Sequence, residues 1–288
     1  MTASVPLLAP AHFSFDTFPV CQWHRFRQHQ PHFMKKLLLP MLTLALAAAA
    51  LAAEKDSRAF ELRVYYAAPG KLDDLNKRFR EHTVKLFEKH GMENIGYWVP
   101  LDNDENRLIY VLAFPSRAAR DKSFAAFGAD PEWKAAQKAS ELNGKLVNKM
   151  VSHFMEATDF SPAIKPSKSE PDRVFELREY TASEGHLANL DARFRDHTLA
   201  LFTKHGMQNV GYWHLSADQK GADRKLIYIL AHKSQAAGLA SFESFRKDAA
   251  WVKAKDASEK KAGGSLTEGG MAGVKSTYMR PTRYSPTQ

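Results

Sequence analysis

The chain has 288 residues, of which 44% are hydrophobic and 25% charged, a balance typical of a globular protein with an apolar core. Its formal net charge is +9. The positive surplus is spread through both halves rather than gathered in one run, so the sequence gives no nucleic-acid footprint. The one cysteine, Cys21, precedes the expected mature chain. This excludes disulfides, thiolate catalysis and cysteine-ligated metals from the mature protein.

An export signal is expected from Met34 onwards. Two lysines are followed by an apolar stretch over 37–51 and then by Ala-Ala-Glu, and these are the three parts of a secretory signal peptide. Cleavage is expected after Ala52 or Ala53, which would place the protein in the periplasm or outside the cell with no stable membrane insertion. The alternative is an uncleaved anchor, because an apolar run of about 17 residues is near the lower limit of a membrane span. Residues 1–33 are interpreted as a gene-start error or a disordered leader.

The rest of the chain contains the same segment twice. When 60–99 is laid over 175–214, 24 of the 40 positions are identical. A repeat of this length indicates two homologous domains rather than a solenoid. The expected domains are 58–162 and 173–286, joined by a linker over 163–172 that contains two prolines.

Each copy predicts the same order of elements. In the first copy, Phe60–Tyr66 alternates and is rich in aromatic and branched residues, which predicts a strand. From Leu72, apolar residues and histidines recur at three and four residues and predict a helix that Gly91 ends. The later elements are strands over Asn94–Val99 and Arg107–Phe114, a helix capped by Ser116, a helix beginning at Asp130-Pro131, and a strand over Met150–Ala157.

The order β-α-β-β-α-β is the ferredoxin-like arrangement. Such a unit covers one face of its sheet with helices and leaves the other face bare. Two fused copies are therefore expected to pack sheet against sheet as an intramolecular dimeric α/β barrel of the α+β class. In the first strand, we expect Phe60, Leu62 and Val64 to face the helices, and Glu61, Arg63 and Tyr65 to face a partly polar barrel interior.

The repeated motifs resemble the NIPSNAP family. Both copies carry a Phe-Glu-Leu-Arg-x-Tyr strand, a helix ending in Lys-His-Gly-Met, and the sequence Asn-x-Gly-Tyr-Trp. The resemblance covers about 58–160 and 173–286 and implies a dimeric α/β barrel, here made within one chain. It implies no particular reaction, because NIPSNAP-like proteins have no agreed one; related barrel families include small monooxygenases, isomerases and haem enzymes. An export signal departs from the mitochondrial members, so their partners are not carried over.

Two sets of side chains are candidates for a functional site. The helix histidines His82 and His197 would transfer protons or bind haem with help from Arg63 or Arg178; otherwise they are core histidines bonded to the backbone. The strand set would bind a polar or anionic ligand inside the barrel; otherwise it satisfies a structural seam between the sheets. This second set is Glu61, Arg63, Tyr65, Tyr97, Glu176, Arg178, Tyr180 and Tyr212.

The remaining histidines and tryptophans have simpler interpretations. His90 and the equivalent His205 directly precede the helix-ending glycine, where a cation satisfies terminal carbonyls. His82 and His90 are about 12 Å apart along the helix, too far to share a metal ion, and no metal site is expected. Trp98 and Trp213 alternate opposite to the tyrosines, so we expect them beneath the helices.

The leading interpretation is an exported barrel of unassigned activity that binds a small molecule or a partner protein. A homo-oligomer is left open, nucleic acid is not expected, and no cofactor is expected. The alternative is an enzyme of the cofactor-independent monooxygenase-like or haem-handling kind that uses the helix histidines. Both copies retain the full candidate set, which favours a structural role for it.

Overall fold

The computed structural model describes residues 55–168 and 173–288. The leader and the signal peptide expected within 1–53 therefore lie outside the described residues. In the part of the chain that is described, no helix is long and apolar enough to cross a membrane.

The first repeat has the order of elements that the sequence predicts. Ser116 begins a helix as expected, because its hydroxyl accepts the N–H of Ala119 at 3.1 Å, and Asp130 caps the next helix in the same way. The elements are β1 (Ala59–Ala67), α1 (Leu72–Arg78), a π-helix η1 (Phe79–Thr83), α2 (Val84–Lys89), β2 (Glu93–Pro100), β3 (Arg107–Phe114), α3 (Arg117–Ala129), α4 (Pro131–Ser140) and β4 (Val147–Ala157).

The second repeat follows the same order. It adds a short 3₁₀ turn before its last strand. Its elements are β5 (Val174–Thr181), α5 (Leu187–Arg193), a π-helix η2 (Phe194–Thr198), α6 (Leu199–Lys204), β6 (Gln208–Leu215), β7 (Lys225–His232), α7 (Gln235–Lys247), α8 (Ala249–Ala262), η3 (Gly270–Gly273) and β8 (Lys275–Pro281).

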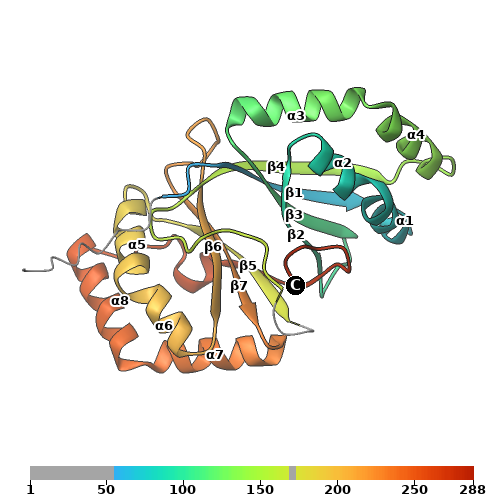
Figure 1. The fold of residues 1–288 in the computed structure, drawn as a ribbon. Helices are drawn as coiled ribbons and strands as arrows, with labels where there is room; N and C mark the ends of the chain where they lie inside the picture. Colours follow the sequence, from blue (N-terminus) through green and yellow to red (C-terminus); the bar gives the residue numbers. More distant parts are fainter. Residues whose placement is uncertain (1–54, 169–172) are drawn as a thin grey trace, which may run out of the picture. The chain divides into compact units, whose positions relative to one another are not determined.

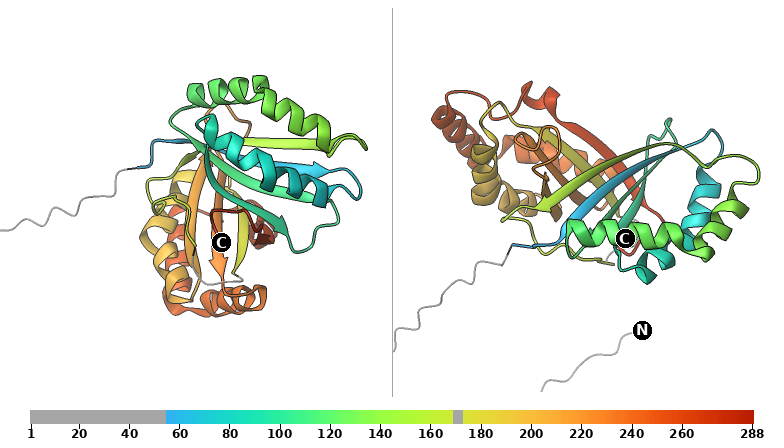
Figure 2. Two further views of the ribbon diagram at one scale, coloured as in Figure 1. Left: turned by 45° about the vertical axis from the view of Figure 1, so that its right-hand side comes forward. Right: turned by 90° about the horizontal axis from the view of Figure 1, so that it is seen from above.

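The eight strands close into one antiparallel barrel in the order β1-β3-β2-β8-β5-β7-β6-β4. Each repeat supplies four adjacent strands, and two short seams join them: β2 pairs with β8 over Trp98–Pro100, and β4 pairs with β6 over Met155–Ala157. Helices α1–α4 lie outside the strands of the first repeat and α5–α8 outside those of the second (Figure 1), so the strands lie between two helical layers (Figure 2). The expected intramolecular dimeric α/β barrel is confirmed.

The two faces of the sheet are the reverse of what we predicted. Phe60 and Leu62 point into the barrel, where Trp98 and Trp213 join them in a core built from both repeats. Tyr65 and its polar neighbours instead lie between the sheet and the helices. The physical reason is that the barrel interior is the enclosed space and takes the purely apolar face. The amphipathic face meets helices, which can supply charged partners.

A π-helix interrupts the first long helix of each repeat. In η1, the N–H of Val84 donates to the carbonyl of Phe79, five residues back, and the Thr83 hydroxyl donates to the carbonyl of Arg78 at 3.3 Å. The extra residue rotates the following turn, so Thr83 is buried where a regular helix would bury His82. His82 is half-buried and the equivalent His197 is exposed.

Each repeat sends its C-terminal segment across to the other. After β8, Ser285 accepts the backbone N–H of Tyr97 in the first repeat at 2.9 Å. After β4, Ser161 accepts the backbone N–H of Tyr212 in the second repeat at 3.0 Å. The two crossing segments hold the repeats together beyond the short strand seams.

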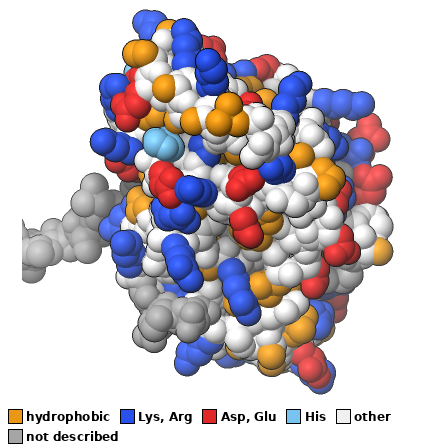
Figure 3. Space-filling model, turned by 90° about the vertical axis from the view of Figure 1, so that its right-hand side faces the viewer, with side chains coloured by type: hydrophobic (Ala, Val, Ile, Leu, Met, Phe, Trp, Pro, Cys, Tyr) orange, Lys and Arg blue, Asp and Glu red, His pale blue; other side chains and the backbone are white. Residues whose placement is uncertain are grey.

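Charged side chains of both signs are scattered among apolar and neutral ones over the face of the molecule shown in Figure 3. Few large apolar side chains are exposed among the described residues; Leu142, with 77% of its surface exposed, is an example. This distribution is typical of helices that turn their apolar sides to a sheet.

Candidate functional site

Each repeat buries one carboxylate between its first strand and the helix that follows its third strand. In the first repeat, Glu61 is fully buried and its Oε1 accepts Arg63 Nη1 at 2.6 Å. Arg120 of α3 donates to both carboxylate oxygens, at 2.8 and 2.9 Å, and the Ser152 hydroxyl donates at 2.5 Å. Two guanidinium groups and a hydroxyl therefore satisfy this carboxylate and cover it.

The second repeat surrounds the equivalent Glu176 differently. Arg178 Nη1 and the Ser276 hydroxyl each donate to Oε1 at 2.5 Å, as in the first repeat. The other oxygen, Oε2, lies 3.0 Å from Nε2 of His232 on β7. Because an ionised carboxylate only accepts, we assign the proton of the pair to Nε2 of the imidazole. Its Nδ1 is buried and has no hydrogen-bond partner among the described residues.

The helix cap that both repeats share fixes which residues correspond. Ser116 and Ser234 cap α3 and α7 with the same geometry, so Gly238 occupies the position of Arg120 and His232 that of Phe114. A Cβ atom at Gly238 would lie 3.0 Å from both the His232 ring and the Tyr278 hydroxyl. Glycine at this position therefore makes room for these two side chains, and the arginine lid of the first repeat is absent.

A cavity of about 240 Å³ opens over Glu176 where that lid is missing. Leu239 and Phe242 of α7 give it apolar walls, while Arg178 and Arg246 bring positive charge. Tyr278 adds a phenol from β8, opposite Glu176 in the strand pairing. An apolar pocket with a few convergent polar groups is the usual form of a small-molecule site.

Both carboxylates are held ionised. Burial raises the pKa of Glu176, but the hydrogen bond from His232 and the charge of Arg178 outweigh burial and hold the pKa below its ordinary value. In the first repeat Arg120 and Arg63 do the same for Glu61. Burial and the negative charge of Glu176 raise the pKa of Tyr278, so its phenol keeps its proton.

The predicted strand residues do come together, but beneath the helices rather than inside the barrel. Tyr65 and Tyr180 accept a hydrogen bond from Arg63 and Arg178 respectively. Each guanidinium also lies over a phenylalanine ring of the overlying helix, 4.3 Å from the centroid for Arg178 and Phe242.

The other two predicted tyrosines are part of the core. Tyr97 and Tyr212 are fully buried and donate hydrogen bonds to Asn94 and Asn209 of the same strands. Each stacks on a neighbouring tyrosine ring, with 5.2 Å between centroids for Tyr97. Neither of them lines the cavity over Glu176.

The structure does not bring the helix histidines to the strand arginines. His82 lines a separate depression beside α4, with Arg78 and Glu81. His90 and His205 bond the carboxylates of Asp130 and Asp248, at 2.7 and 2.8 Å, and not the terminal carbonyls we expected. Each of these pairs ties the end of the first long helix to the N-cap of the second helix after the third strand, α4 or α8.

Several residues of the site escaped the sequence reasoning, namely Arg120, Ser152, His232, Gly238, Ser276 and Tyr278. The signal was present in the repeat itself, because aligning the two serine caps pairs an arginine with a glycine and a phenylalanine with a histidine. Among the described residues, no group of three or more His, Asp or Glu side chains is arranged to hold a metal ion.

Comparisons with known proteins identify the family. The NIPSNAP family model matches residues 60–162 and 175–286. No curated protein matches the chain. A NIPSNAP family protein of unknown function from Agrobacterium tumefaciens is 23% identical and covers 37% of this chain and 93% of its own, with a TM-score of 0.33.

Two longer structures cover most of the barrel. A candidate monooxygenase from Lactobacillus acidophilus is 10% identical and covers 78% of this chain and 94% of its own, with a TM-score of 0.50. An anthrone oxidase-like protein is 14% identical and covers 82% and 96%, also with a TM-score of 0.50. At these identities the likeness concerns the fold alone. With both repeats matched by the family model, the chain belongs to the NIPSNAP family, as a tandem member whose two domains close one barrel.

Proposed function

We propose that this protein binds a small ring compound with an acidic hydroxyl group, a phenol or a cyclic enol, in the cavity over Glu176. The observation that carries the proposal is Gly238, which removes from the second repeat the arginine that covers the carboxylate in the first. Glu176 lines the cavity and is fully buried in the unliganded protein. Each carboxylate oxygen has two acceptor sites, and Oε2 uses one of them for His232, so we infer that a ligand hydroxyl donates to the other as it enters. The Leu239 and Phe242 walls favour an apolar ring behind that donor.

The first repeat shows which side chains would close the cavity. Its equivalents of His232, Gly238 and Tyr278 are Phe114, Arg120 and Phe154, a set that the same fold accommodates. The triple variant His232→Phe, Gly238→Arg, Tyr278→Phe should therefore fold and place an arginine lid over Glu176. The reverse triple variant in the first repeat should open a second cavity over Glu61.

The test is ¹⁹F NMR of 4-fluorophenol with wild-type protein and both triple variants. We expect saturable line broadening with wild-type protein, none with the closed variant, and a second equivalent of bound probe with the reverse variant. Binding that persists in the closed variant, or wild-type protein that leaves the probe unchanged, would contradict the proposal.

An enzymatic alternative rests on the Glu176–His232 pair. In this alternative a bound enol gives its proton to Glu176, which lines the cavity, while His232 bonds the carboxylate at 3.0 Å from outside the lining. The monooxygenase-like alternative then requires molecular oxygen as the oxidant, as in the conversion of anthrone and O₂ to anthraquinone and water.

Oxygen uptake with anthrone, measured on the same three proteins, separates the alternatives. Uptake by wild-type protein that the closed variant loses favours the enzyme, and its absence leaves the binding function.

We also propose that the protein is exported. The signal-like sequence from Met34 to Ala53 supports this, with its two lysines, apolar stretch and small residues. The mass of the protein recovered from the periplasm should match a chain that starts at Ala53 or Glu54. A mass that retains the apolar stretch would contradict cleavage.

A further inference from the structure

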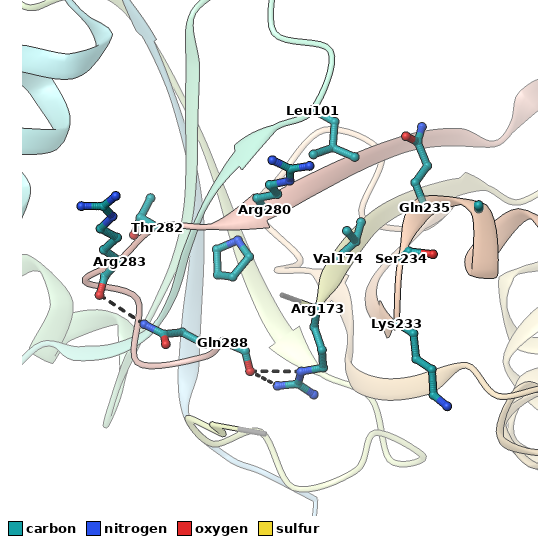
Figure 4. Close-up of a pocket in the computed structure, with 12 residues that line it drawn as sticks. Leu101, Arg173, Val174, Lys233, Ser234, Gln235, Arg280, Thr282, Arg283 and Gln288 are labelled. Atoms are coloured by element: carbon teal, nitrogen blue, oxygen red, sulfur yellow. Dashed lines mark hydrogen bonds between the residues drawn. The ribbon is translucent and has the colours of Figure 1, made fainter. Parts of the chain in front are cut away.

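A second cavity, of about 900 Å³, lies at the seam between β2 and β8. Arg280 and Arg283 come from β8 and the segment after it, while Lys233 comes from the loop before α7 (Figure 4). Arg173 lies between these two walls and donates to the carbonyl of Gln288 and, at 2.5 Å, to Gln208. No Asp or Glu is among the described residues that line the cavity.

The duplication provides an internal comparison for this charge. The matching ends of the repeats, Phe160-Ser161-Pro162 and Tyr284-Ser285-Pro286, place Glu156 where the second repeat has Arg280 and Asp159 where it has Arg283. Both positions are therefore acidic at one seam of the barrel and basic at the other. Because the same backbone accepts either sign, the fold itself does not require the basic residues.

A third position differs in the same direction. The residue before the capping serine is Pro115 in the first repeat and Lys233 in the second. Together these three differences add positive charge to the cavity at the β2–β8 seam.

Three of the cations that line the cavity are accessible to a ligand. Arg280, Arg283 and Lys233 are exposed, and none of them forms an ion pair with a described residue, whereas at the opposite seam Asp159 pairs with Arg195 at 2.7 Å. The N-terminus of the 13-residue helix α7 also lines the cavity, through Gln235 and Ala236, and adds a partial positive charge.

From this charge reversal we infer that the cavity at the β2–β8 seam binds a small polyanion, a molecule with two or more phosphate or carboxylate groups. Two or more groups are required because the cations stand on two walls, with Arg280 and Arg283 on one and Lys233 on the other (Figure 4). The volume accommodates a molecule considerably larger than a single phosphate ion. This site is separate from the cavity over Glu176 and does not depend on the function proposed for it.

The test uses the residues of the other seam. The variant Arg280→Glu, Arg283→Asp takes the side chains that the first repeat carries at the same positions, so it should fold. Its matched control is Lys253→Glu, Lys260→Glu, which makes the same change in net charge at exposed positions on α8. Binding of pyrophosphate, citrate and inorganic phosphate is measured by isothermal titration calorimetry at low ionic strength, with unfolding temperatures as the check on folding.

We expect pyrophosphate and citrate to bind wild-type protein more tightly than inorganic phosphate does. Their affinity should fall about tenfold or more in the Arg280→Glu, Arg283→Asp variant and stay close to wild type in the control. Added salt should weaken the binding in wild-type protein. Equal losses of affinity in the two variants would show that net charge alone causes the effect and would overturn the proposal. A wild-type protein that binds neither polyanion would overturn it as well.

Discussion

At the scale of single residues, the Gly-Tyr-Trp sequence of each repeat has a packing explanation. The indole of Trp98 folds back inside the barrel over Gly96, the residue two before it on the same face of β2. A Cβ atom at Gly96 would lie 2.2 Å from the Trp98 ring, and one at Gly211 would lie 2.5 Å from the ring of Trp213. Glycine is therefore required by the space that the tryptophan occupies.

We predict that Gly96→Ala lowers the free energy of unfolding by about 1–3 kcal/mol, because the added Cβ overlaps a fully buried indole and forces it or the surrounding core to shift. Gly211→Ala should have a similar effect. The matched control is Gly128→Ala, near the end of α3, where an added Cβ meets nothing within 4 Å. Chemical denaturation measures all three, and a Gly96→Ala protein as stable as the control would contradict the packing explanation.

At the scale of elements, the sequence predicted the order and most of the boundaries. The alternating pattern of Phe60–Tyr66, the Ser116 and Asp130 caps and the glycine at position 91, with φ of 75°, all gave the expected strands, helices and helix end. These signals are local, since each depends on residues within a few positions. The π-helix escaped prediction because no cap or breaker marks it, and it moved His82 out of the buried stripe.

The assignment of faces failed at the same scale for a different reason. Alternation in β1 separates Leu62 from Glu61 and Arg63, but it does not say which side meets helices. The side that meets helices depends on Arg120 of α3, which follows the first long helix and two more strands. Its guanidinium pairs with the carboxylate of Glu61 and so allows this charge to be buried beneath α3. The candidate site was therefore half predictable: its strand residues were found, while the helix residue that distinguishes the two repeats was not.

At the scale of the whole molecule, the two repeats differ in the cavities that they form. The positions retained in both, such as the Glu–Arg pair of the first strand, build the interface between sheet and helices. The positions that differ, Arg120 against Gly238 and Glu156 against Arg280, are those that open a cavity or reverse its charge. Duplication allows this division, because one repeat can keep the closed form while the other provides access.

The two repeats nevertheless share one barrel core. Phe60 of the first repeat packs against Trp213 of the second, with 5.8 Å between ring centroids, and Trp98 packs against Phe175 at 5.5 Å. The crossing C-terminal segments add hydrogen bonds in both directions. Neither sheet can expose its apolar face to water without losing these contacts, so we expect the two repeats to unfold together.

Native-state hydrogen exchange tests this coupling with a variant placed in one repeat only. Gly96→Ala perturbs the first repeat directly, yet it should lower the opening free energy of the slowest amides in β5 and β7 by the same amount as in β1 and β3. The Gly128→Ala control should lower the opening free energy of neither set, because its side chain meets no neighbour and alanine favours the helix more than glycine does. If exchange in β5 and β7 stayed at the wild-type rate while β1 and β3 opened more easily, the second repeat would hold its structure alone. The barrel would then be an association of two independent domains.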